Sequence, residues 1–149
     1  MTTIAEADTR THVQNIWTEA LGIPVVPAPC VDIGGCEGFV TGSVAIDGDW
    51  RGLIVLQCHE AAAWAAMRAM HAIDTDGATT EQLHDVVAEL ANMTCGGIKA
   101  LLPGRCTIAL PVVADGCAVV DPQRYALAQE HGFLCGGNPV FVRVYEAVQ

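Results

Sequence analysis

The stretch TTEQLHDVVAELANMTCGGIKALLPG, residues 79–104, carries the clearest local signals in the chain. Thr79 and Gln82 have the spacing of a capping box, in which each side chain bonds the backbone of the other residue at a helix start. Pro103-Gly104 is typical of a helix end. The pattern predicts one long helix from about Thr80 to Leu102. Six apolar residues share one stripe of it and should pack on a sheet: Leu83, Val86, Val87, Leu90, Met93 and Leu101.

Segments on both sides of this helix predict the strands of that sheet. Residues 38–58 read GFVTGSVAIDGDWRGLIVLQC, with β-branched residues around Asp47-Gly48-Asp49, which is the composition of a hairpin with a tight turn. After the helix, three more strands are predicted at residues 105–113, 116–120 and 139–147. Residues 121–133, DPQRYALAQEHGF, are predicted to form a turn or a short helix.

Two further helices precede the long one. Residues 8–24 carry one apolar stripe that ends before stop signals: Val13, Ile16, Trp17, Ala20 and Leu21. Residues 59–73 are predicted to form an alanine-rich helix. The order helix, strands, helix, helix, strands suggests an internal pseudo-repeat. Because no low-complexity linker divides the halves, we expect a single α/β (α+β) domain over residues 1–149, with a mixed β-sheet packed against long helices.

Composition excludes several classes of function. The chain has 149 residues, a hydrophobic fraction of 52% and a net charge of -10 at pH 7, so nucleic acid or an anionic membrane would repel it. No apolar run approaches the roughly 18 residues that span a bilayer, and the N-terminal residues lack the pattern of a secretory signal. We therefore expect a cytoplasmic protein that binds neither nucleic acid nor membrane.

The cysteines and histidines do not have the spacing of a metal site. The chain has neither a CxxC pair nor an HxxxH or HExxH pattern, so no metal and no cofactor is expected. In a reducing compartment, the seven cysteines are expected to be small buried hydrophobic residues. A redox or metal module built from them stays as a weaker alternative. They are Cys30, Cys36, Cys58, Cys95, Cys106, Cys117 and Cys135.

A second stripe of the long helix carries the candidate site. Asp85, Glu89, Asn92 and Gly96 follow one another at offsets of four, three and four residues, roughly opposite the apolar stripe. Acids and amides are common on any solvated helix face. However, asparagine is a mediocre helix former, and each glycine of Gly96-Gly97 costs about 1 kcal/mol relative to alanine. Small residues beside an acid and an amide would let the backbone of another protein approach closely.

The sequence DVVAELANMTCG, residues 85–96, resembles the motif DxxxExxNMxxG of the CheX/CheC family of chemotaxis phosphatases. The resemblance extends over roughly residues 38–116, which look like the strand hairpin of the family and the strand that follows its helix. Only one ExxN is present, because the first helix has no Glu three residues before an Asn, so the chain resembles CheX rather than CheC. Thr94 and Cys95 depart from the more usual aliphatic or small residues.

The resemblance implies a partner and a reaction. Members of this family dephosphorylate CheY-like response-regulator receiver domains, which supply the phosphorylated Asp, Mg²⁺ and a lysine. Asn92 would then position the attacking water, and Glu89 would pair with the lysine of the receiver. Asp85 and Gly96 would contact the partner. The resemblance also implies a homodimer, and a non-catalytic receiver-binding adaptor or ligand-sensing module on the same fold is the alternative.

Overall fold

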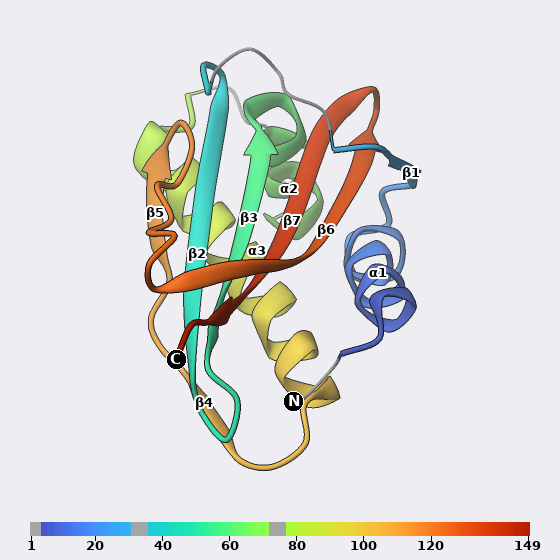
Figure 1. Cartoon of the computed structure of the whole chain (residues 1–149). Coiled ribbons are helices and arrows are strands. Elements are labelled where there is room, and N and C mark those ends of the chain that lie inside the picture. The colour runs from blue at the N-terminus through green and yellow to red at the C-terminus, as the bar shows by residue number, and fades with distance from the viewer. Residues whose placement is uncertain (1–3, 31–35, 72–76) are drawn as a thin grey trace.

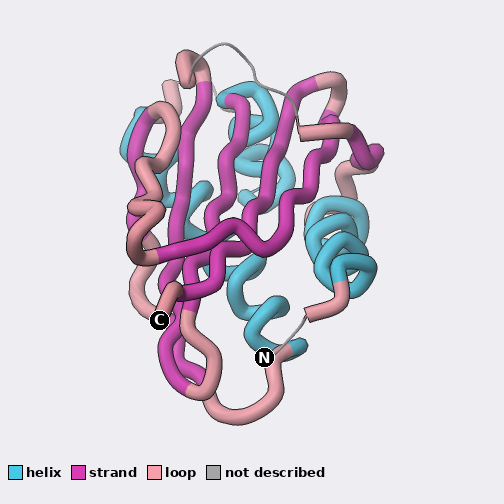
Figure 2. The backbone as a smooth tube through the Cα atoms, in the orientation of Figure 1, coloured by secondary structure: helices cyan, strands magenta, loops and turns pink. Residues whose placement is uncertain are grey.

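The chain folds into a sheet of seven strands with helices on one face (Figures 1 and 2). The computed structural model describes residues 4–30, 36–71 and 77–149. The helices are α1 (Glu6–Asn15), its π-helical continuation η1 (Ile16–Ala20), α2 (Glu60–His71) and α3 (Thr80–Leu101). The strands are β1 (Val25–Ala28), β2 (Phe39–Gly48), β3 (Gly52–His59), β4 (Cys106–Ile108), β5 (Val112–Asp115), β6 (Tyr125–Cys135) and β7 (Asn138–Ala147).

The sheet has the strand order β1-β6-β7-β3-β2-β4, and β5 also pairs with β2. Among the described residues every pair of neighbouring strands is antiparallel, so the expectation of a mixed sheet is wrong in this respect. The reason is topological. The long strands come as two hairpins, β2-β3 and β6-β7, and the two strands of a hairpin are antiparallel. Where the hairpins meet, β3 of the first also runs antiparallel to β7 of the second. The predicted α/β class is confirmed.

The predicted pseudo-repeat is visible in the connections between strands. The first half of the chain contributes α1, one short strand and a long hairpin, and the second half contributes α3, two short strands and a long hairpin. The two hairpins meet where β3 pairs with β7. The short strand β1 of the first half pairs with β6 of the second half. In return, β4 and β5 of the second half pair with β2 of the first. The two halves therefore complete each other's sheet.

The long helix packs against the centre of this sheet. α3 lies mainly on β2 and β3, and α2 lies beside it against β3 and β7 (Figure 1). At Gly42 of β2, an added Cβ would stand 3.0 Å from the Cβ of Ala91, so the absence of a side chain lets α3 approach the strand closely. Along the strands, alternate residues enter the core below the helices: Val40, Val44, Ile46, Ile54, Leu56, Cys58, Val140, Val142 and Val144.

The second half of the chain differs most from expectation. Residues 121–133, predicted as a turn or short helix, contain most of β6, which pairs with β7 over nearly its whole length. Residues 116–120, predicted as a strand, form none, because the N–H of Gly116 already bonds the carbonyl of Phe39, the first residue of β2, and among the described residues no strand residue lies opposite the chain beyond that point. The strand predicted over residues 105–113 is split into β4 and β5 around Leu110-Pro111, since proline lacks an N–H group.

The first helix largely follows its prediction, whereas the first strand was not predicted. Of the predicted apolar stripe, Val13, Ile16 and Trp17 are buried and Leu21 is half-buried, but Ala20 is exposed, because it ends η1 and lies outside the packed contact. β1 was not expected, because it has only four residues, one of them Pro27. Proline is tolerated there since β1 is an edge strand of the sheet. In the described part of the chain, no helix is both long and apolar enough to cross a membrane.

Candidate functional site

The helix that carries the motif is capped as its sequence predicts. The backbone N–H of Gln82 donates to Thr79 Oγ1 at 3.1 Å, and the N–H of Thr79 donates to Gln82 Oε1 at 2.8 Å. Both halves of the capping box are therefore formed. One residue of the apolar stripe was placed wrongly. Leu101 is 39% exposed, because it is the last residue of α3, where the helix has neighbours on fewer sides.

The outer face of α3 presents the candidate site to solvent. Asp85, Glu89 and Asn92 are exposed, and Gly96 is half-buried. Within the described ranges, the side chains of these three polar residues make no hydrogen bond and no ion pair. A free carboxylate and a free amide thus lie one helical turn apart on a rigid element, as their spacing predicts. An amide with unused donors and acceptor can orient a water molecule, and the carboxylate can accept from a cation.

The glycine pair has two different explanations. A Cβ on Gly97 would stand 1.7 Å from Cε1 of His12, so the ring of that histidine occupies the space which the glycine leaves. His12 Nε2 lies 3.2 Å from the carbonyl oxygens of both Met93 and Thr94. Gly97 is therefore explained by the packing of α1 against α3 rather than by a partner. A Cβ on Gly96 would meet nothing within 4 Å, so this position is open on the outer face.

The two departures from the family pattern do not reach the outer face. Thr94 is buried, and its Oγ1 donates to the carbonyl of Leu90 at 2.7 Å within the helix. Cys95 is also buried, and this burial raises the pKa of its thiol to about 12, so the thiol stays protonated. Both side chains face the core. The chemistry available at Glu89 and Asn92 is the same as it would be with aliphatic residues at these positions.

A contact that the sequence did not reveal joins α3 to the edge of the sheet. His84 Nε2 lies 2.8 Å from Asp115 Oδ1 at the end of β5. His84 directly precedes Asp85 on the helix, so the contact joins the N-terminal half of the motif to β5, which pairs with the edge of β2. The two residues are 31 positions apart, and neither belongs to a recognisable motif. No local signal could have paired them.

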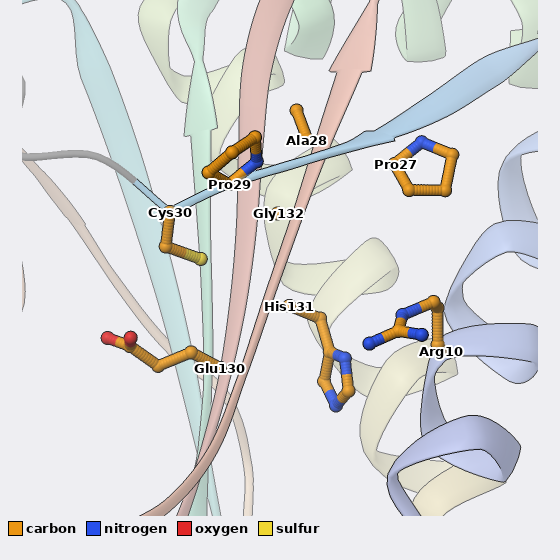
Figure 3. Close-up of a pocket in the computed structure, with 8 residues that line it drawn as sticks. All are labelled: Arg10, Pro27, Ala28, Pro29, Cys30, Glu130, His131 and Gly132. Atoms are coloured by element: carbon orange, nitrogen blue, oxygen red, sulfur yellow. The ribbon is translucent and has the colours of Figure 1, made fainter.

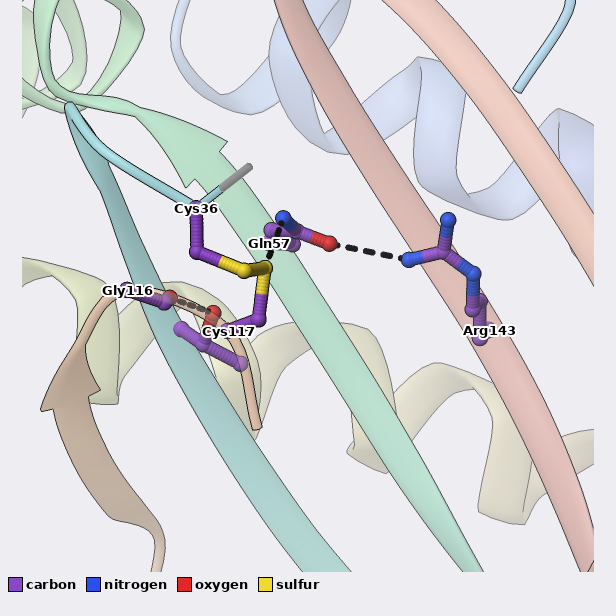
Figure 4. Close-up of a disulfide and its surroundings, with 6 residues drawn as sticks. Cys36, Gln57, Gly116, Cys117 and Arg143 are labelled. Carbon is purple, nitrogen blue, oxygen red and sulfur yellow. Dashed lines mark hydrogen bonds between the residues drawn. A yellow bond between two sulfur atoms is a disulfide. The ribbon is translucent and has the colours of Figure 1, made fainter. Parts of the chain in front are cut away.

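Two of the cysteines are bonded to each other, which corrects the expectation that all seven are small buried residues. Cys36 and Cys117 form a disulfide, with their Cα atoms 5.2 Å apart and 81 positions between them in sequence (Figure 4). Gln57 Nε2 donates to Cys117 Sγ at 3.0 Å, and Arg143 Nη1 donates to Gln57 Oε1 at 2.9 Å. The disulfide joins the segment before β2 to the segment after β5, which approach only in the folded chain.

The remaining cysteines fit the expectation better. Cys58, Cys95, Cys106 and Cys135 are buried, and Cys30 is half-buried. In the part of the chain that the structure describes, no group of three or more His, Cys, Asp or Glu side chains could hold a metal ion. Neither the cysteines nor the histidines supply an alternative metal centre there.

Comparisons with known proteins agree with this geometry. A family model described as chemotaxis phosphatase CheX matches residues 40–125, more than half of the chain. A solved chemotaxis protein CheX from Vibrio vulnificus has a TM-score of 0.77 and 21% identity, covering 98% of this chain and 100% of that one. A CheC-like superfamily protein from Shewanella sp. PV-4 has a TM-score of 0.72 and 18% identity, covering 93% and 94%.

A third solved structure contains a partner protein. One chain of the CheX-CheY-BeF3-Mg²⁺ complex from Borrelia burgdorferi has a TM-score of 0.68 and 15% identity, covering 99% of this chain and 100% of that one. At these identities, the structural likenesses establish the fold. No curated protein matches the sequence.

Proposed function

Because the chain belongs to the CheX family of chemotaxis phosphatases, we propose that it binds a phosphorylated CheY-like receiver domain and accelerates hydrolysis of its aspartyl phosphate. One observation carries the proposal: Glu89 and Asn92, the two polar residues of the ExxN motif, are exposed and unpartnered on one face of α3. The partner is of the kind named in the complex from Borrelia burgdorferi. The pathway is chemotaxis or related two-component signalling in the cytoplasm.

Asn92 acts on the attacking water. Hydrolysis forms a bond from the water oxygen to phosphorus, breaks the bond from phosphorus to the aspartyl oxygen, and releases a carboxylate and inorganic phosphate. An amide accepts one hydrogen bond from this water and holds it in line with the leaving oxygen. It has no basic group, so the proton passes to the phosphate oxygens or to solvent. Mg²⁺ and the lysine belong to the receiver.

Glu89 acts on the partner rather than on the water. Its carboxylate pairs with the lysine of the receiver and thereby fixes the angle at which α3 approaches. Asp85 and Gly96 lie on the same face. The carboxylate of Asp85 contacts the receiver, and the open space at Gly96 lets the receiver backbone approach the helix closely. With a net charge of -10, the chain does not steer itself toward an acidic Mg²⁺ pocket, so recognition depends on these short-range contacts.

We also propose a homodimer, formed through the edge of the sheet at β4 and β5. This edge exposes apolar side chains that a soluble monomer rarely keeps: Leu110 is 87% exposed and Val112 is 67% exposed. Ile108 of β4 extends the same edge. An unpaired apolar edge strand is a template for pairing with a second chain, and a second copy would cover it.

The experiment is phosphate release from a panel of phosphorylated receivers, with the parent protein and three variants. Asn92→Ala should lower turnover by roughly 10²-fold or more while receiver binding is nearly kept, because its interaction is made only in the transition state. Glu89→Ala should also weaken binding, since it removes a charge-assisted contact. Glu81→Ala removes an exposed carboxylate of the same helix outside the motif and is the matched control.

Two results would contradict the proposal. If no receiver in the panel loses phosphate faster with the parent protein, but one binds it, the chain is the non-catalytic adaptor. If Asn92→Ala keeps parental turnover on an active receiver, the water-positioning role is wrong. Thermal unfolding is the control for folding, and each exposed substitution should change stability by less than about 1 kcal/mol.

A further inference from the structure

A second polar site lies between α1 and the end of β1, away from the motif (Figure 3). It is a cavity of about 400 Å³, within the range of small-molecule sites. Arg10 of α1 and His131 of β6 line it together with Glu130 and Cys30. Neither the ExxN motif nor the proposed receiver contact uses any of these side chains.

The tautomer of His131 follows from its hydrogen bonds. Gln129 Nε2 donates to the carbonyl of Ile4 at 2.6 Å, which leaves Gln129 Oε1 to face His131 Nε2 at 2.9 Å. Because Oε1 can only accept, Nε2 of His131 carries the proton and Nδ1 holds a lone pair. Burial, with a smaller contribution from Arg10, lowers the pKa of His131 and so favours this neutral form.

Nδ1 of His131 is the one buried side-chain nitrogen or oxygen in the described residues that has no hydrogen-bond partner. The residue is only 3% exposed, and its ring faces the cavity on the side of Arg10 (Figure 3). A buried acceptor without a donor has lost its hydrogen bonds to water and gains none from the protein. The ring therefore selects a ligand that brings an O–H or N–H group.

Arg10 favours a ligand that also carries a negative charge. Its side chain is exposed and makes no hydrogen bond or ion pair with any described residue. A free guanidinium at a cavity wall binds carboxylate or phosphate oxygens. The other lining groups do not oppose an anion, because Glu130 is already paired with Arg143 at 3.1 Å and burial raises the pKa of the Cys30 thiol.

We propose that this cavity binds a small hydroxylated acid, with its oxyanion on Arg10 and its O–H donating to Nδ1 of His131. A 2-hydroxycarboxylate and a singly or doubly charged phosphate both carry this pair of groups. The cavity is larger than a bare phosphate ion, so the natural ligand has further atoms that fill the space beside Pro27 and Pro29.

The test uses two matched pairs of probes on the full chain. Lactate carries the hydroxyl that propanoate lacks, and inorganic phosphate near neutral pH carries a P–O–H that sulfate lacks. Binding is followed by NMR through the ring nitrogens of His131. In at least one pair, the probe with the O–H should bind roughly tenfold more tightly and shift the Nδ1 resonance, as expected for one hydrogen bond to a buried acceptor. The pair that responds identifies the carboxylate or the phosphate as the acid.

Arg10→Gln tests the second contact, and Arg105→Gln is its control, since it removes the same charge from an exposed position outside the cavity. Arg10→Gln should abolish saturable binding, whereas Arg105→Gln should leave it unchanged. Equal binding of both members in both pairs would overturn the assignment of His131. Binding that survives Arg10→Gln, or no saturable binding of any probe, would overturn the site and leave Nδ1 to a water molecule.

Discussion

Alanine at Gly96 and at Gly97 should have opposite effects on stability, although the two residues are adjacent in one helix. Replacing a glycine inside a helix by alanine stabilises it by about 1 kcal/mol through backbone entropy. At Gly96 nothing lies within 4 Å of the new Cβ, so Gly96→Ala should keep this gain in full. At Gly97 the new Cβ would stand 1.7 Å from Cε1 of His12, so the ring must leave.

The displaced ring costs more than the helix gains. Overpacking of a tight contact costs about 1–3 kcal/mol, and losing the hydrogen bond that His12 Nε2 shares between the carbonyls of Met93 and Thr94 costs about 1 kcal/mol. Less the helix gain, Gly97→Ala should destabilise the fold by about 2 kcal/mol. The two variants should then differ by about 3 kcal/mol, or roughly 6–12 °C in Tm for a domain of this size.

The assay is thermal and urea unfolding of both variants beside the parent and the double variant His12→Ala/Gly97→Ala. Removing the ring should recover part of the loss caused by Gly97→Ala, because the clash disappears. A rise in Tm for Gly97→Ala equal to that for Gly96→Ala would refute the packing of α1 on α3. Gly96→Ala carries a second expectation from the proposed function: it should weaken receiver binding while it stabilises the fold.

Three further outcomes are expected. If β4 and β5 form the dimer edge, the parent should sediment as a dimer at micromolar concentration and Leu110→Glu as a monomer, and a monomeric parent would count against the edge. The Cys36–Cys117 disulfide closes a long loop, so reduction or Cys36→Ser should lower the free energy of unfolding by up to about 4 kcal/mol, and a parent indifferent to dithiothreitol would contradict this. Burial and Arg10 lower the pKa of His131, against a smaller opposite effect of Glu6. As pH falls below 6.5, the unfolded chain therefore takes up a proton at this residue before the folded chain does, so the contribution of His131 to stability is present above that pH and lost below it. NMR titration of the ring in the folded protein should give a midpoint below 6.5.

Signals that lie within a few residues of one another were sufficient for α3 and for the candidate site. The capping box of Thr79 and Gln82 predicts where α3 begins, and helical periodicity predicts which stripe is buried. The same periodicity places Glu89 and Asn92 together on the exposed face, because side chains three residues apart share a face in any helix. For the β2-β3 hairpin, the turn residues between two β-branched runs were likewise enough.

Features that depend on contacts between distant residues were decided only by the tertiary structure. Residues 125–133 became part of β6 although their composition suggests a turn or helix, because strand formation depends on the partner β7 more than on local propensity. Gly97 suggested a partner site, yet it serves His12, 85 positions earlier in the chain. Cys36 and Cys117 lie together because β5 pairs with β2, which brings the segments beside these strands to the same place. In each case the stabilising contact joins segments that are far apart in the sequence, so no local sequence pattern could predict it.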